Sequence, residues 1–267
     1  MKRKRIYIAY TGGTIGMKKS SRGYIPAEGF LTETVVNNAE FNREEMPLFD
    51  IHEYCPLIDS SDMSPAHWQL IADDIKSKYH DYDGFVVLHG TDTMAYTASA
   101  LSFMFENLTK PVIVTGSQIP LSQLRSDGQV NLLNAMFLAA NYPIAEVSLF
   151  FNNQLFRGNR ATKAHADGFN AFASPNLEPL ALSGINIQLI KGQLSPYVEN
   201  ELQVTTITPQ PIGVLYLYPG ISKDVVKSLV NDNIKALVLL SFGVGNAPQD
   251  PDFLDVLSEA SKRGMVI

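Results

Sequence analysis

Two threonine-containing segments stand out by their residue types and their spacing. Residues 11–16 read TGGTIG and residues 89–93 read HGTDT, and each segment directly follows a short apolar run. If both runs are parallel strands, Thr14 and Thr91 lie near their carboxyl ends, where open α/β sheets bind ligands. Two hydroxyl groups beside Asp92, without a cluster of metal-ligand residues, indicate covalent acyl chemistry.

Each segment also has a simpler interpretation. The glycines before Thr14 permit a tight turn and close approach to a ligand, but such a turn can merely link a strand to a helix. The segment is neither a phosphate-binding loop nor a dinucleotide fingerprint. Thr91 and Asp92 stand where a helix is expected to begin, and helix amides there favour an oxyanion or a carboxylate. Asp92 is equally compatible with an ordinary acid in a first helical turn.

A threonine hydroxyl is a weak nucleophile and requires a base or a polarising partner. The candidates are Lys163, Tyr24 and the five histidines. The histidines lack metal-ligand spacing, and we interpret His89 as orienting a neighbour rather than transferring a proton. Spacing alone favours a surface position for Lys163. We predict no bound metal and no cofactor.

Charge and cysteine usage limit the partners and the compartment. The 267 residues include 21 basic and 27 acidic side chains, and this net charge of −6 disfavours a nucleic-acid partner. The single cysteine, Cys55, fits a reducing compartment and is expected to be buried. The basic residues 2–5 precede an apolar run too short for a secretory signal, and no window reaches the roughly 18 apolar residues of a membrane span. We predict a cytoplasmic protein without a membrane partner.

Strand and helix patterns alternate along the chain and predict a doubly wound, mostly parallel α/β sheet with right-handed crossovers. Ser64 is expected to cap a helix that begins at Pro65. Residues 17–28 are expected to form a mobile loop. The expected strands are 6–10, 51–58, 84–88, 111–115 and 146–151, and the expected later helices are 92–106 and 126–141.

A second, smaller α/β run follows, with strands expected at 212–218 and 236–240 and helices at 222–230 and 252–263. We place an N-terminal catalytic domain at 1–190, a linker at 191–210 and a partial C-terminal domain at 211–267. The final residues, GMVI, are typical of the start of a buried strand. We therefore expect the C-terminal domain to be truncated.

The two segments together resemble the signatures of the bacterial-type asparaginase/glutaminase family. The resemblance extends through residues 116–118 (GSQ), 157–160 (RGNR) and 243–246 (GVGN), and covers essentially the whole chain. Without a signal peptide, the chain is similar to the cytoplasmic, type I L-asparaginases. The resemblance implies an amidohydrolase that converts L-asparagine into L-aspartate and ammonia through a threonine-bound β-aspartyl ester. It also implies a homodimer or homotetramer if the C-terminal domain is complete.

The resemblance assigns catalytic roles to matched residues. Thr14 matches the nucleophile, and Tyr24 on the same loop helps to position or activate it. Thr91, Asp92 and Lys163 match a second hydroxyl–acid–lysine group, in which a neutral Lys163 draws the proton of Thr91. The sequence leaves open which threonine acts in which step.

Substrate binding is assigned in the same way. Ser60 matches the residue that holds the substrate α-carboxylate, and Asp92, beside Thr91, pairs with the α-ammonium group. Asp59 and Ser61 flank Ser60 and are expected to line the same pocket.

Some cytoplasmic members bind asparagine at a separate effector site, where Thr162 matches a family residue. An arginine that certain members carry is Leu240 in this chain. Loss of a guanidinium removes a clamp for a carboxylate, so we predict weak or absent allosteric activation.

Three alternative functions stay open. A glutaminase differs by one substrate methylene, which gives only about 1–3 kcal/mol of discrimination. A tRNA-dependent amidotransferase subunit would need a basic patch or an RNA-binding segment, and neither is visible. A non-catalytic amino-acid sensor is compatible with the fold alone but is disfavoured because all matched catalytic residues are present.

Overall fold

The computed structural model describes residues 3–21, 23–190, 194–195 and 200–267. The chain divides into two compact units, Met1–Ile207 and Thr208–Ile267. The linker expected at 191–210 includes residues 191–193 and 196–199, which lie outside the described residues. The domain limits therefore stay a prediction.

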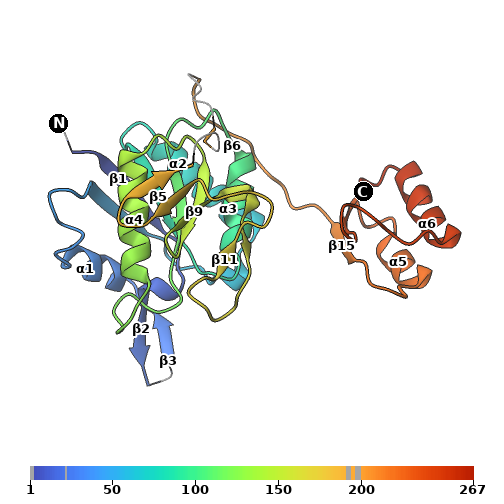
Figure 1. The fold of residues 1–267 in the computed structure, drawn as a ribbon, viewed down its shortest axis with the longest axis horizontal. Helices are drawn as coiled ribbons and strands as arrows, with labels where there is room; N and C mark the ends of the chain where they lie inside the picture. The colour runs from blue at the N-terminus through green and yellow to red at the C-terminus, as the bar shows by residue number, and fades with distance from the viewer. Residues whose placement is uncertain (1–2, 22, 191–193, 196–199) are drawn as a thin grey trace. The chain divides into compact units, whose positions relative to one another are not determined.

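A mostly parallel sheet forms the centre of the first unit (Figure 1). Among the described residues it has eight strands in the order β13-β12-β9-β8-β7-β5-β1-β4. The parallel strands are β4 (Leu48–Glu53), β1 (Arg5–Tyr10), β5 (Gly84–Leu88), β7 (Val112–Thr115) and β8 (Val147–Phe151). The strands that continue the sheet antiparallel to their neighbours are β9 (Gln154–Arg157), β12 (Ala181–Ser183) and β13 (Ile187–Leu189). The predicted α/β class with a mostly parallel sheet is confirmed.

Both faces of this sheet are buried, because successive residues of a strand point to opposite sides. In β1, Tyr7 and Ala9 enter one hydrophobic core, whereas Ile6 and Ile8 enter the other. Helices complete each core. The first core contains residues of α2 (Pro65–Lys78) and α3 (Met94–Met104), and the second contains residues of α1 (Phe30–Val36) and α4 (Gly128–Asn141).

Short elements connect this framework. Two-residue strands pair as β6 (Phe105–Glu106) with β14 (Gln203–Val204), and as β10 (Thr162–Lys163) with β11 (Phe172–Ala173). Three 3-10 turns are η1 (Thr14–Gly16), η2 (Ser60–Asp62) and η3 (Gly158–Arg160).

Residues 17–28, expected as a mobile loop, contain two strands. β2 (Met17–Ser20) and β3 (Gly23–Pro26) pair as an antiparallel hairpin, which projects from the first unit in blue in Figure 1. Every residue of β3 is exposed. The hairpin therefore lacks the alternation of buried and exposed residues that identifies a strand in a sequence.

The strand expected at 51–58 also differs, because β4 begins at Leu48 and ends at Glu53. Pro56 has no N–H for a ladder hydrogen bond, so the chain leaves the sheet before it. Cys55 lies in this departing segment and is exposed, with its thiol donating to Glu28 Oε1 at 3.3 Å. The expectation of a buried Cys55 was wrong.

The second unit has its own core. β15 (Ile212–Tyr216) and β16 (Ala236–Leu240) are parallel, and α5 (Lys223–Leu229) and α6 (Pro251–Lys262) supply the other elements. Leu215, Leu237, Val226 and Phe253 are buried together. Beyond α6, Val266 forms a parallel bridge to Ala236. No helix in the described ranges is long and apolar enough to cross a lipid bilayer.

Candidate active site

The two threonine segments meet at the carboxyl edge of the sheet, after the neighbouring strands β1 and β5. The chain runs from β1 to β4 on one side and then to β5 on the other, so ligands are expected between β1 and β5. A Cβ atom on Gly13 would lie 2.5 Å from Gly90 N, and one on Gly90 would lie 2.4 Å from Ser60 Oγ. Glycines therefore allow the loops after β1, β4 and β5 to touch.

A cavity of about 150 Å³ lies between these loops. Five residues predicted for the site line it, namely Thr14, Asp59, Ser60, Thr91 and Asp92. Both candidate nucleophiles thus face one small polar cavity.

Thr14 begins η1, directly after two glycines with positive φ angles. Its hydroxyl group makes no hydrogen bond within the described part of the chain. Lone pairs that the described residues leave unengaged suit a group that attacks a bound molecule.

Lys163 reaches the site from β10. Its Nζ donates to Thr91 Oγ1 at 3.0 Å and to Asp92 Oδ1 at 2.6 Å. The lysine side chain is 20% exposed, whereas that of Asp92 is 65% exposed. The structure thus places Lys163 beside Thr91 rather than on the open surface that spacing alone favoured.

Asp92 lies outside α3, which begins at Met94 with Thr93 as its N-cap residue. The helix therefore does not begin at residue 92, and Asp92 is not in its first turn. Thr93 instead donates its hydroxyl to Ser60 O at 2.6 Å and ties the start of α3 to η2. The Asp92 carboxylate pairs with Lys163.

Gln118 follows β7 and completes the hydrogen bonding of Thr91. Its Nε2 donates to Ala166 O at 3.1 Å and to Gly168 O at 3.0 Å, so Oε1 accepts from Thr91 Oγ1 at 3.1 Å. An ammonium group only donates, so Thr91 accepts from Lys163 and directs its own proton to Gln118. Sequence reasoning gave Gln118 no role, although it follows the carboxyl end of the next parallel strand.

The expected substrate-binding residues are held by η2. The Asp59 carboxylate accepts from Ser61 N and from Ser61 Oγ, both at 2.9 Å. Ser60 is 5% exposed and lines the cavity, whereas Ser61 does not. Ser61 therefore fixes Asp59 and does not face the cavity.

Two predicted residues lie away from the cavity. Tyr24 is on β3, 47% exposed, and its hydroxyl donates to Gln123 Oε1 at 3.4 Å. Met17 and Pro26, which pair at the base of the hairpin, line the cavity instead. Thr162 neighbours Lys163 on β10 but is exposed and does not line the cavity.

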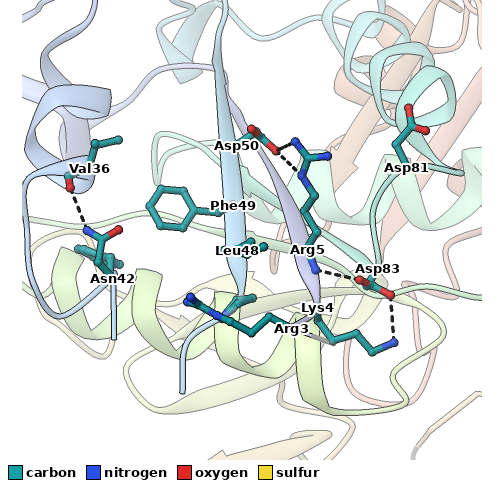
Figure 2. A pocket seen from close by; sticks show the side chains of 12 residues that line it. Arg3, Lys4, Arg5, Val36, Asn42, Leu48, Phe49, Asp50, Asp81 and Asp83 are labelled. Carbon is teal, nitrogen blue, oxygen red and sulfur yellow. Dashed lines mark hydrogen bonds and ion pairs between the residues drawn. The ribbon is translucent and has the colours of Figure 1, made fainter. Parts of the chain in front are cut away.

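A larger cavity of about 760 Å³ lies at the amino ends of β1 and β4, the sheet edge opposite to the threonines. Figure 2 shows that its charged side chains are largely paired, with Arg5 on Asp50 and Lys4 on Asp83. Arg3 donates to the backbone carbonyl of Met46. These basic groups already have hydrogen-bond or ion-pair partners within the protein, and they form no arrangement like that of Lys163 with Thr91 and Asp92.

The fold and the small cavity define an α/β protein with a hydroxyl–lysine–carboxylate site at the switch point of its sheet. Two family models match the chain: asparaginase, N-terminal, over residues 5–194, and glutaminase/asparaginase C-terminal domain over residues 211–267. The chain belongs to the asparaginase family.

Individual relatives agree with this family. The chain is 66% identical to L-asparaginase 1 of Escherichia coli, with 100% of this chain and 79% of the relative covered. It is 44% identical to the human 60 kDa lysophospholipase over 99% of this chain and 50% of that protein. The crystal structure of L-asparaginase I from Vibrio cholerae matches with a TM-score of 0.94 at 64% identity, over 99% of this chain and 80% of that chain.

Proposed function

We propose that this protein is an amidohydrolase that converts L-asparagine into L-aspartate and ammonia. The observation that carries the proposal is one cavity lined by Thr14, Thr91 and Asp92, with Lys163 bonded to the latter two. Similarity to proteins named L-asparaginase supports this substrate over glutamine.

Thr14 is the proposed nucleophile. Its hydroxyl loses a proton as the oxygen attacks the side-chain amide carbon of asparagine. The carbon–nitrogen bond then breaks, and the nitrogen takes up that proton and leaves as ammonia. A β-aspartyl ester on Thr14 results. Water then attacks the ester carbon, which releases L-aspartate, and a proton from the water restores the Thr14 hydroxyl.

Thr91 and Lys163 are proposed to move protons for these steps. Because Thr91 donates to Gln118 and accepts from Lys163, proton transfer to the lysine requires a neutral amine and a rotated hydroxyl. Asp92 Oδ1 lies 2.6 Å from the lysine nitrogen and holds it in place. The neutral amine can then act as a base, through the Thr91 hydroxyl, toward the attacking hydroxyl or water.

The free amino-acid groups of the substrate are proposed to bind at the cavity wall. Ser60 offers a hydroxyl to the α-carboxylate, and the Asp59 and Asp92 carboxylates favour the α-ammonium. Tyr24 is proposed to approach Thr14 through movement of the β2–β3 hairpin, whose base already lines the cavity. Thr162 remains a proposed effector contact.

A cytoplasmic location and a homo-oligomeric assembly are also proposed. The single cysteine fits a reducing compartment. Assembly as a homodimer or homotetramer is what the family resemblance implies.

The test is ammonia release from L-asparagine and from L-glutamine, measured in parallel for the 267-residue chain and its Thr14→Ala and Thr14→Ser variants. Release from asparagine that Thr14→Ala abolishes and Thr14→Ser partly keeps supports the proposal. Faster release from glutamine would instead indicate a glutaminase. Tight binding of asparagine without turnover would indicate a sensor.

A further inference from the structure

His89 is fully buried, directly before Gly90, which lines the cavity. Its Nδ1 is 2.7 Å from Gly90 O, and its Nε2 is 2.8 Å from Thr97 Oγ1 on α3. Trp68 Nε1 on α2 donates to the same Thr97 hydroxyl at 2.9 Å. A chain of hydrogen bonds therefore runs from Trp68 through Thr97 and His89 to the backbone beside Thr91.

The chemistry of these partners fixes the tautomer of His89. A carbonyl oxygen only accepts, so Nδ1 carries the proton toward Gly90. Thr97 accepts from Trp68 and donates to Nε2, which must then be unprotonated. Burial lowers the pKa of His89 to about 4, so the ring remains neutral over the ordinary working range.

This hydrogen bond determines how the Gly90–Thr91 peptide is oriented. The peptide is trans, so its N–H points opposite to its carbonyl. Because the carbonyl is turned to the buried ring, the N–H of Thr91 points away from that ring. Gly90 and Thr91 both line the cavity. No described residue accepts a hydrogen bond from this N–H.

Gly90 cannot hold its own orientation by a side chain, and the space around it admits none, because an added Cβ atom would lie 2.4 Å from Ser60 Oγ. A glycine has the widest range of backbone conformations. The imidazole restricts that freedom at the residue directly before Thr91.

We propose that His89 is a positioning residue that locks the Gly90–Thr91 peptide through its Nδ1–H and so aims the backbone and hydroxyl of Thr91 at the bound amide. The inference rests on the proposed function, in which Thr91 takes part in the reaction. His89 itself touches neither substrate nor the reacting atoms.

Two substitutions test the roles of the two ring nitrogens separately. In His89→Asn the amide N–H can replace Nδ1–H toward Gly90, whereas the longer side chain of His89→Gln places its amide near the Nε2 position and Thr97. Both variants remove the ring, so both lose packing. We expect His89→Gln to lose about 100-fold in kcat, the scale of a misplaced reacting group, and His89→Asn to lose clearly less. KM should change little in either, because Ser60 and Asp92 bind the substrate α-groups.

A second matched pair tests the tautomer. Thr97→Val removes the donor to Nε2, so that only the Gly90 carbonyl then favours the Nδ1–H tautomer, and kcat should fall. Trp68→Phe removes the outermost hydrogen bond and part of a ring that packs against the first core, and should keep kcat while lowering thermal stability. The proposal is overturned if the loss of kcat in the four variants follows only their loss of unfolding temperature and does not depend on which ring nitrogen is replaced.

Nuclear magnetic resonance of the uniformly 15N-labelled chain gives a readout independent of turnover. We expect the Nδ1–H tautomer for His89, and a Thr91 amide resonance that moves in His89→Gln more than in His89→Asn. An Nε2–H tautomer, or an equal movement in both variants, overturns the proposal. If the unsubstituted chain releases no ammonia, the proposed function fails, and these resonances still decide the role of His89.

Discussion

Lys163 Nζ lies 3.0 Å from Thr91 Oγ1, although 72 positions of sequence separate the two residues. The contact exists because β10 brings the lysine to the loop after β5. An ammonium group only donates, so Thr91 can only accept from a charged Lys163. In the proposed mechanism, activation of Thr91 therefore begins with loss of a proton from the lysine.

Replacing Lys163 tests this order of events. Lys163→Met should lower kcat by about 10²–10⁴-fold, the usual contribution of a general base. Its ion pair with the exposed Asp92 adds little stability, about 0–1 kcal/mol, so thermal unfolding should change little. Lys163→Arg is the control that keeps the charge but does not deprotonate in proteins. An active Lys163→Arg enzyme would show that charge rather than proton transfer is required.

Gln118 should be sensitive to loss of its donor groups. Gln118→Glu places a carboxylate against Ala166 O and Gly168 O, which then lose their hydrogen bonds. We expect a loss of about 1–3 kcal/mol in unfolding free energy, together with a lower kcat. Gln123→Glu is a useful control, because the Gln123 side chain accepts a hydrogen bond from the exposed Tyr24 hydroxyl and does not line the cavity. Equal effects of the two substitutions on kcat would argue against a specific role for Gln118.

The sequence identified the framework because the central strands are continuous apolar runs. Residues 84–88 form β5, which is entirely buried, and a short apolar run of this kind is typical of a central parallel strand. Because open α/β sheets bind ligands at the carboxyl ends of their strands, Thr14 and Thr91 could then be placed in one site. Gln118 was missed because its importance depends on the carbonyl groups of Ala166 and Gly168, which come close only in the folded chain.

The exposed regions were harder to predict. The β2–β3 hairpin has no row of buried side chains, and the end of β4 depends on the bend at Pro56. Misplacing that strand end also led to the wrong environment for Cys55. Local patterns identify elements that bury a face, and are weak where solvent contacts both faces.

Gly13 should tolerate no side chain. Gly13→Ala combines a φ of +95° with a Cβ atom only 2.5 Å from Gly90 N. Gly23→Ala is a matched control, because Gly23 has a φ of +99° but no atom within 4 Å of its added Cβ. Backbone strain costs about 1–3 kcal/mol at either position, whereas only Gly13→Ala should also displace the loops and abolish turnover. Similar activity of the two variants would contradict the argument that loop contact requires glycine.

Effector binding should be weak in this chain. The arginine that certain family members carry is Leu240 here, and a leucine offers no bond to a carboxylate. We expect a hyperbolic dependence of rate on asparagine concentration, with no change of shape in Thr162→Ala. A sigmoidal curve that becomes hyperbolic in this variant would show that effector activation persists.

Stability should depend on pH through His89. Burial lowers its pKa from 6.5 to about 4 in the folded chain, so between these values the unfolded state binds more protons than the folded state. The contribution of the neutral ring is fully present above about pH 6.5 and is lost as pH falls toward 4, with an upper limit of roughly 3 kcal/mol. Urea unfolding at several pH values should therefore show a steeper loss in the unsubstituted chain than in His89→Asn. The variant His80→Asn serves as the control and should retain the steep loss, and identical pH profiles for all three proteins would exclude His89 as the source.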